Sequence, residues 1–291
     1  MEIGQRLKKI RENKNFTQKE IGRKHLTSAQ MSKIEHGDQK IYATDLIKIL
    51  NNLFVSYDEF CLFSNDEHLK ARRKAKFYCA ELTQNGNPKQ LLDGISKLKY
   101  WYKEFDDIYF QHLQCLLEAT HCLFTTNNDY EKAREFLNPI SDYLISRGDW
   151  FYYELSLFTN ILYLYPPESA IAEGKDVLKK IQKQYERFAD YNITRSLLIN
   201  LAIYSLDDSQ YYEALNFTNQ VLAFPHSTDY LYDVLLAKII KQIACFKLRL
   251  NEFDKDYLHQ LVDTLKTLNL HDIHKQVKKF LEKHDLAYQI I

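Results

Sequence analysis

The chain has 291 residues, of which 45% are apolar and 27% charged, and its 39 basic side chains balance its 39 acidic ones. This composition excludes a largely disordered chain, and the zero net charge excludes a general electrostatic attraction to nucleic acid or membranes. The 7 glycines and 5 prolines make up about 4% of the chain, against roughly 12% on average, which favours helices with short connections over sheets with tight turns.

Charge spacing and cysteine usage indicate a location inside the cell. Charged residues recur every few positions from Glu2 onward, so no apolar signal-peptide core is present. The longest uncharged run, residues 155–167, falls short of the roughly 18 residues that a membrane-spanning helix needs. The 5 cysteines form no CxxC pair and are expected to be reduced and buried. We expect a cytoplasmic protein that does not bind membranes.

Residues 1–65 predict a domain of five short helices. Ile3, Leu7 and Ile10 recur at helical spacing, Thr17 and Glu20 form a capping box, and Gly37 is placed to end a helix. The first expected helix starts near residue 3 and frays at 13–15, and the second starts at 17 and is followed by a short turn that residue 26 closes. The others cover about residues 28–37, 46–53 and 58–63. Two short helices joined by a tight turn outline a helix-turn-helix domain, and 11 basic against 8 acidic residues give this part a positive charge.

The start of the third helix carries the residue types that read DNA. A helix in the major groove presents small or polar side chains at its N-terminal end, where base edges are reached first. Ser28, Ala29 and Gln30 lie at that end, and Lys33 follows one turn later. Glutamine can form a bidentate pair with adenine. Met31 and Ile34 are expected to lie in the core instead.

Contacts to the DNA backbone are expected from the helices that precede this one. Gln18 begins the second helix and is placed to hold a phosphate together with the helix N-terminus, which Thr17 caps. Arg11 and Lys14 are further candidates for backbone contacts. The alternative for Arg11 and Lys33 is that they are solvated surface charges.

Residues 66–76 read as a polar linker entering a helix, and residues 77–291 as a helical repeat domain. Tyr130-x-x-Ala133-x-x-Phe136 recurs 81 residues later as Tyr211-x-x-Ala214-x-x-Phe217. Each copy is expected to begin a helix and to be followed by a second apolar helix, at residues 150–165 and 229–250, with breakers at 138–139, 148, 166–167 and 224–225. Because one helix pair cannot bury its apolar face alone, the pairs should stack into a solenoid.

Two sequence patterns resemble known families. Residues 17–21, TQKEI, with residues 30–37, QMSKIEHG, resemble the Xre/Cro-type helix-turn-helix pattern. Residues 26–35, LTSAQMSKIE, and 150–160, WFYYELSLFTN, are similar to Rgg-type regulators of the RRNPP superfamily, which includes the PlcR-type proteins. The resemblance implies an all-α chain, with a five-helix Xre-type domain followed by a right-handed solenoid similar to tetratricopeptide (TPR) repeats.

The same resemblance implies the function. Its members are bacterial transcription regulators that bind promoter DNA as homodimers and respond to a short hydrophobic signalling peptide in the concave groove of the repeat domain. An alternative keeps the DNA binding but gives the repeat domain a protein partner. A third possibility, a repressor without a ligand, leaves the long repeat region without a use.

A groove for an apolar peptide needs aromatic walls and a few polar groups for the peptide backbone. Asparagine amides both donate and accept hydrogen bonds, and Arg195 and Lys238 could meet a carboxylate. With 21 tyrosines and 17 phenylalanines, many aromatic residues must instead be core. The remaining candidates are Trp150, Tyr152, Tyr153, Phe158, Asn160, Tyr163, Asn192, Asn200, Tyr204 and Tyr232.

Enzyme motifs do not occur in the sequence. There is no P-loop, GxSxG or GxGxxG, and His271 and His274 have no third metal ligand nearby in sequence. We therefore expect no catalysis, no cofactor and no metal site.

Overall fold

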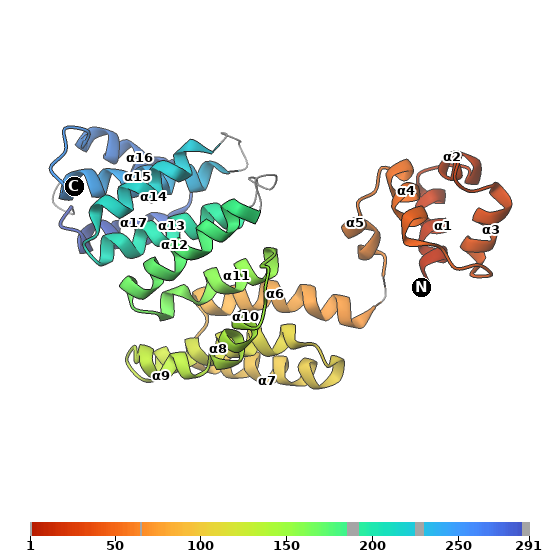
Figure 1. Ribbon diagram of the computed structural model, residues 1–291, viewed down its shortest axis with the longest axis horizontal. Helices are drawn as coiled ribbons and strands as arrows, with labels where there is room; N and C mark the ends of the chain where they lie inside the picture. The colour runs from red at the N-terminus through yellow and green to blue at the C-terminus, as the bar shows by residue number, and fades with distance from the viewer. Residues whose placement is uncertain (1, 65, 185–191, 225–229, 287–291) are drawn as a thin grey trace. The chain divides into compact units, whose positions relative to one another are not determined.

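The computed structural model describes residues 2–64, 66–184, 192–224 and 230–286, with only the backbone described at residues 84, 85, 182–184 and 192. All regular secondary structure in these residues is helical (Figure 1). The chain divides into two compact units, residues 1–117 and 118–291. The prediction of an all-α chain with an N-terminal helix-turn-helix domain and helical repeats is confirmed.

The five predicted N-terminal helices are present. Thr17 accepts a hydrogen bond from the Glu20 backbone N–H, and Gly37 ends the third helix with a left-handed φ of 85°. The fourth helix begins three residues before the predicted stripe, which starts at Leu46. The helices are α1 (Ile3–Asn13), α2 (Gln18–Gly22), α3 (Ser28–His36), α4 (Ala43–Leu53) and α5 (Tyr57–Leu62).

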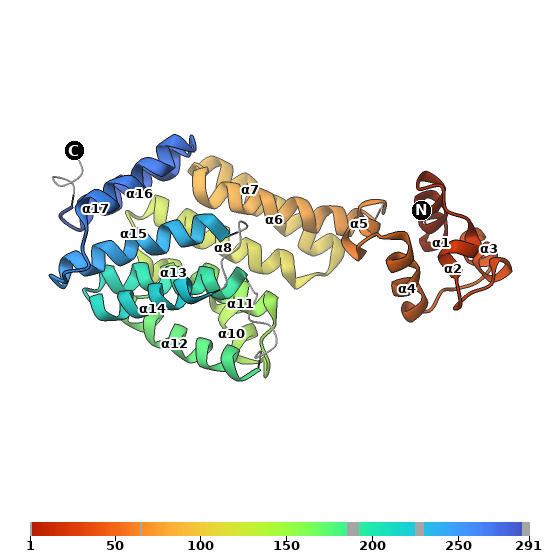
Figure 2. The ribbon, with the colours of Figure 1, turned by 90° about the horizontal axis from the view of Figure 1, so that it is seen from above.

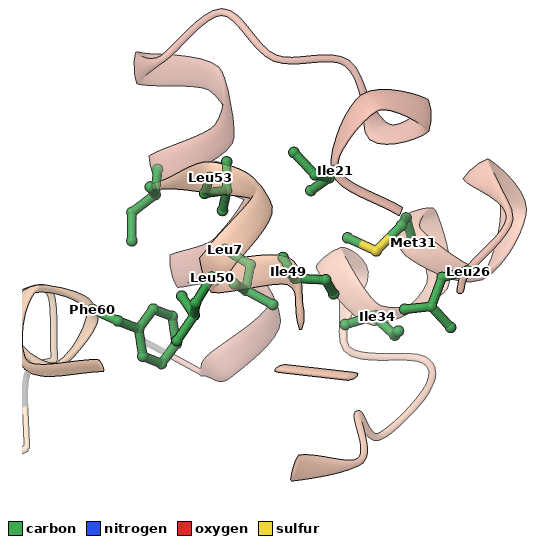
Figure 3. Packing of buried hydrophobic residues seen from close by; sticks show 10 residues of the cluster. Leu7, Ile21, Leu26, Met31, Ile34, Ile49, Leu50, Leu53 and Phe60 are labelled. Atoms are coloured by element: carbon green, nitrogen blue, oxygen red, sulfur yellow. The ribbon is translucent and has the colours of Figure 1, made fainter. Parts of the chain in front are cut away.

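These helices enclose a small apolar core (Figure 3). Leu7 of α1, Met31 of α3 and Leu53 of α4 are fully buried in it. Gly4 lies where α1 crosses α3, and a β-carbon there would overlap the Ile34 carbonyl oxygen. The close packing of α1 on α3 therefore depends on this glycine, and it fixes the base of the helix that we expected to read DNA.

The next three helices are α6 (Glu67–Asn85), α7 (Pro88–Phe105) and α8 (Ile108–Thr125). Asp66 caps α6, so residues 67–76, predicted as a linker entering a helix, lie within that helix. Helices α6 and α7 pack against each other, as both ribbon views show (Figures 1 and 2).

The corner between α7 and α8 is tied to the start of α6 through Asp107. Its carboxylate accepts hydrogen bonds from Arg72, from the Tyr109 backbone N–H at 3.1 Å, and from the ring of His68 at 2.7 Å. Burial alone would raise the pKa of Asp107, but these hydrogen bonds outweigh it and lower the pKa to about 2.

We expect Asp107→Asn to reduce the free energy of unfolding by about 2 kcal/mol at pH 7. Because the folded pKa of Asp107 lies below the unfolded value of about 3.9, the carboxylate stabilises the fold above about pH 4. That stabilisation disappears as the pH falls from 4 to 2. Urea unfolding of both proteins at several pH values tests this, and a stability difference that stays constant down to pH 2 would contradict it.

The remaining helices start at the predicted repeat. Ala133 and Ala214 are both fully buried, and each copy of the repeat begins a helix. The first copy forms a helix of only six residues, because Pro139 starts a new helix in the position where proline is tolerated. The elements are α9 (Tyr130–Glu135), α10 (Asn138–Ile145), α11 (Tyr152–Ile161), the 3-10 helix η1 (Leu162–Leu164), α12 (Pro167–Gln184), α13 (Asn192–Asp207), α14 (Tyr211–Ala223), α15 (Leu231–Lys247), α16 (Lys255–Thr267) and α17 (His271–Lys283).

Helix α13 lies at the centre of this unit. It packs against its sequence neighbours α12 and α14 and also directly against α11 and α15. Helices α11, α13 and α15 therefore form one layer, called here the α11–α13–α15 layer, while consecutive helices from α12 to α17 pack in series (Figures 1 and 2). This is the alternation that stacked helix pairs produce.

Two further features concern the described residues as a whole. None of their helices is both long and apolar enough to cross a membrane. All five cysteines are buried, as predicted, and none of them forms a disulfide: Cys61, Cys79, Cys115, Cys122 and Cys245.

Candidate DNA-binding and peptide-binding sites

The N-terminal half of α3 presents a polar, exposed face. Ser28, Ala29 and Gln30 are exposed, and Lys33, one turn later, is exposed as well. The opposite face is buried through Met31 and Ile34, as predicted. The core thus holds α3 by one side and leaves the four predicted base-reading residues on the other.

Gln30 also has a structural task. Its side-chain oxygen accepts a hydrogen bond from the Thr27 backbone N–H at 2.9 Å, while the Gln30 backbone N–H donates to the Thr27 hydroxyl at 3.2 Å. This capping box starts α3 and holds the Gln30 side chain at the exposed end of the helix. The sequence contains its signal, Thr-x-x-Gln, which our prediction overlooked.

Arg11 has a different role from the predicted phosphate contact. Its guanidinium forms two hydrogen bonds to Glu35, at 2.6 and 2.8 Å, and a third to the Phe16 carbonyl oxygen. The hydrogen bond to Glu35 raises the pKa of Arg11 further above its ordinary value. Gln18 donates to the same carboxylate at 2.8 Å. Since Glu35 is only 1% exposed, Arg11 neutralises a buried charge. We therefore do not count Arg11 among the residues that contact DNA.

The two other expected backbone contacts, Lys14 and Thr17, are both exposed. Lys14 lies beside the Phe54 carbonyl oxygen, 3.5 Å from it, with its ammonium group accessible. Thr17 caps α2, and its hydroxyl also donates to Glu20. Hydrogen bonding by Thr17 lowers the pKa of Glu20, which therefore stays ionised at neutral pH.

We expect Gln30→Ala to reduce the discrimination between operator and random DNA by about 10- to 100-fold, the effect of losing one good base contact. Thr27→Ala is the matched control, because it breaks the same capping box and leaves the Gln30 amide in place. The control should lower the stability of α3 by about 1 kcal/mol without changing discrimination. Competition between a selected operator and random DNA measures the discrimination of both variants. Equal loss of discrimination in the two variants would remove Gln30 from base reading.

The α11–α13–α15 layer carries most of the predicted peptide-binding residues. Helix α13 is buried on nearly all sides, and its half-exposed positions include Ser196, Asn200 and Tyr204, which are spaced one turn apart along one face. Asn160 is exposed near the end of α11, and Tyr232 is exposed in the first turn of α15. Tyr163 lies in η1, which directly follows α11. With it, two asparagines and three tyrosines of the predicted set come from neighbouring helices.

Two phenol groups of this set, those of Tyr163 and Tyr204, lie close enough to influence each other. The hydroxyl of Tyr163 is hydrogen-bonded to the hydroxyl of Thr120 on α8 at 3.1 Å. Burial raises the pKa of Tyr163, and it raises the pKa of Tyr204 more strongly, with smaller contributions from Tyr163 and Asp207. Both phenols are therefore neutral hydroxyls at physiological pH, able to donate and to accept hydrogen bonds.

Two predicted peptide contacts are core residues instead. Phe158 is 4% exposed and packs on Trp150, with ring centroids 5.4 Å apart. Arg195 is 1% exposed, stacks on the Tyr230 ring at 3.2 Å and lies 3.7 Å from Asp233. Neither side chain is accessible to a ligand. The charge of Arg195 is balanced within the protein by Asp233 rather than by a carboxylate of the peptide.

The other candidates lie at the margins of the layer. Trp150 precedes α11 and lines a cavity of about 300 Å³ with residues of α12, including Val177 and Lys180. Tyr153 is half-buried against Tyr143, and the Lys238 ammonium lies over the Tyr257 ring of α16. Tyr152 is exposed at the first position of α11. The side chain of Asn192 lies outside the described residues.

Two further residues were missed at the sequence level. Glu35 accepts hydrogen bonds from both Arg11 and Gln18. The sequence signal for it was an acidic residue inside a helix expected to face phosphates, because such a negative charge needs a cationic partner within the protein. Ser196 shares the exposed face of α13 with Asn200, and its signal is the four-residue spacing from that asparagine.

Two protein-family models together match most of the chain. Residues 4–61 match a helix-turn-helix domain, and residues 90–279 match the C-terminal domain of the HTH-type transcriptional regulator Rgg. The second match alone covers more than half of the chain.

Solved structures have the same fold. A cysteine-to-serine variant of the SHP pheromone receptor Rgg2 of Streptococcus dysgalactiae is 19% identical, with a TM-score of 0.73 over 97% of this chain and 99% of that one. PlcR of Bacillus thuringiensis, in complex with the peptide PapR7 and DNA, is 19% identical, with a TM-score of 0.70 over 94% and 98%. PrgX with cCF10 is 17% identical, with a TM-score of 0.71 over 98% and 92%. At this identity the likeness establishes the fold alone, and the family matches establish that the chain belongs to the Rgg family of helix-turn-helix transcriptional regulators.

Proposed function

We propose that the protein is a homodimeric transcription regulator that binds promoter DNA and is controlled by a short hydrophobic signalling peptide in its repeat domain. The observation that carries this proposal is the set of exposed or half-exposed amide and phenol groups on neighbouring helices, Asn160, Tyr163, Asn200, Tyr204 and Tyr232. Related folds solved with a peptide and DNA, such as PlcR with PapR7, support the same reading.

In this proposal residues 1–65 are the DNA-binding domain. Ser28, Ala29 and Gln30 face the bases, and Lys33 binds the backbone or a base one turn further along. Lys14, Thr17 and Gln18 are placed near phosphates, although Gln18 shares its amide with Glu35. Residues 77–291 bind the peptide and join the two copies.

The layer sets the length of peptide that it can hold. Packed helices lie about 8–10 Å apart, so the axes of α11 and α15 are separated by roughly 16–20 Å across α13. An extended chain rises about 3.3 Å per residue, so about five or six residues reach from the first helix to the third. The amides of Asn160 and Asn200 are suited to pair with the peptide backbone, while the tyrosines line the apolar side chains.

The proposal includes a cytoplasmic location and no catalytic activity. A peptide controls such a regulator by binding one dimer arrangement more tightly than another and so changing the spacing of the two DNA-binding heads. No chemical step is needed.

Affinity selection tests the peptide. The purified full chain is incubated with a library of synthetic peptides of five to nine residues, and bound peptides are identified by mass spectrometry. We expect enrichment of apolar sequences that compete with one another for a single site. If the selection enriches no peptide but the protein retains a folded protein from cell extract, the peptide hypothesis would be overturned in favour of a protein partner.

A further inference from the structure

A cavity lies between the segment that precedes α11 and the second half of α12. Its volume of about 300 Å³ is at the small end of the range for sites that bind small molecules. It is therefore large enough for a small metabolite but not for a peptide of several residues. The residues that line it include Asp149, Trp150, Leu155, Val177, Lys180 and Ile181.

The inner wall of the cavity is apolar and fixed in place. Leu155, Val177 and Ile181 are buried side chains of α11 and α12. The indole N–H of Trp150 donates a hydrogen bond to the Leu144 carbonyl oxygen at 3.3 Å, and this bond holds the ring beside them. A wall of aliphatic side chains and one aromatic ring suits an apolar group of a ligand.

Two opposite charges line the same cavity where it meets solvent. Asp149 and Lys180 are both exposed, and the Lys180 ammonium lies 5.6 Å from the centre of the Trp150 ring. The neighbouring Lys179 forms an ion pair with Asp176 at 3.0 Å. By contrast, neither Asp149 nor Lys180 forms an ion pair with any other residue that the structure describes. Both charges are therefore available to a ligand in the cavity.

These features together define the chemistry of the occupant. An α-amino acid carries an ammonium and a carboxylate on one carbon atom, next to its side chain. The carboxylate can pair with Lys180 and the ammonium with Asp149, while an apolar side chain packs against the inner wall. An uncharged apolar molecule would leave both protein charges without a counterpart, and a simple anion or cation would leave one.

We propose that this cavity binds a free α-amino acid with an apolar side chain, as a ligand separate from the signalling peptide. The cavity is reached from another side of α11 than the peptide layer. Leu155 lies on a different face of that helix from Tyr152, Ser156 and Asn160, which recur every four residues on its exposed side. The inference therefore goes beyond the proposed function and does not depend on it.

Calorimetric titration of the full chain with L-leucine, L-valine and L-phenylalanine tests the ligand class. We expect at least one of them to bind with a dissociation constant of about 1 mM or lower, as suits so small a ligand. Glycine lacks the apolar side chain, L-leucinamide lacks the carboxylate and 4-methylpentanoate lacks the ammonium. Each of these should bind at least about ten-fold more weakly than leucine.

Fluorescence locates the binding. Trp101→Phe leaves Trp150 as the only tryptophan of the chain, and its emission should change in proportion to the calorimetric occupancy. If none of the three amino acids produces heat or changes this emission, the proposal is wrong. Equal affinities for leucine and 4-methylpentanoate would also overturn it, because the cavity would then be a site for anions.

Substitutions at the two charges test the role of each. Lys180→Ala should weaken leucine binding at least about ten-fold and leave the weak binding of leucinamide unchanged, since leucinamide has no carboxylate for it to lose. Asp149→Asn should weaken leucine in the same way and leave 4-methylpentanoate unchanged. Both residues are exposed, so the fold should be retained. Lys179→Ala is the matched control, because Lys179 is an equally exposed lysine of α12 that pairs with Asp176.

Two results with these variants would contradict the proposal. An equal loss of leucine binding in Lys179→Ala and Lys180→Ala would assign the effect to surface charge in general. In the absence of amino acids, Lys180→Ala should leave the affinity for a peptide from the library selection unchanged. A ten-fold loss of peptide affinity there would make the cavity part of the peptide site and remove the separate ligand, while leaving the proposed peptide control intact.

Discussion

Replacing Glu35 by alanine should destabilise the DNA-binding domain by about 3–5 kcal/mol, the cost of leaving one partner of a buried ion pair without the other. In the folded protein Glu35 is buried beneath Arg11 and Gln18, and both donate to its carboxylate. The substitution leaves the Arg11 guanidinium, itself largely buried, with only the Phe16 carbonyl oxygen and exposed Glu12 as partners. Hydrogen exchange in residues 3–13 and 28–36 of the full chain should accelerate by a hundred-fold or more.

The double substitution Arg11→Met with Glu35→Met is the control for this prediction. It removes both charges and keeps apolar volume, so it should recover most of the lost stability. Exchange rates in Glu35→Ala that match the unaltered protein would show that the ion pair does not hold α1 and α3 together. An equally large loss in the double variant would assign the effect to packing rather than charge.

Replacing Asn160 and Asn200 together by alanine should weaken peptide binding by about 100- to 10,000-fold. Each amide that leaves a peptide backbone group without its partner costs about 1–3 kcal/mol, and the two residues lie on different helices, so their effects should be close to additive. Fluorescence anisotropy with the highest-ranked peptide from the library selection measures the affinity. The single variants should each show about half of the loss in free energy.

Asn216→Ala is the matched control for the asparagine pair. Asn216 is an exposed asparagine on α14, outside the α11–α13–α15 layer, and its substitution should leave peptide affinity unchanged. Unchanged affinity in the Asn160 and Asn200 double variant, with the fold intact by circular dichroism, would place the peptide elsewhere. The cavity beside Trp150 and Lys180 would then be the next region to probe.

Local signals were sufficient to predict most of the DNA-binding domain. The capping box at Thr17 and the glycine at Gly37 mark helix ends through interactions within a few residues, so they are readable without the fold. Arg11 could not be assigned in this way. Its partner Glu35 is 24 positions away, and only the packing of α1 on α3 brings the two together.

The repeat domain was harder to predict for a different reason. Amphipathic spacing identifies the buried face of a helix that has one exposed side, but α13 has neighbours on nearly every side. Arg195 therefore lies in the core although it is charged, and Asn200 on the same helix remains half-exposed. Phe158 and Asn160 show the same divergence on α11, two residues apart. Burial in these helices is set by the neighbouring repeats.

The central claim is that this chain is a dimeric, sequence-specific DNA reader. Selection from a random duplex library with the purified full chain, with and without the peptide identified by affinity selection, tests it most directly. The account predicts an enriched motif with two-fold symmetry and half-sites about one helical turn apart, whose enrichment changes when the peptide is present. Failure to enrich any motif under both conditions would contradict it.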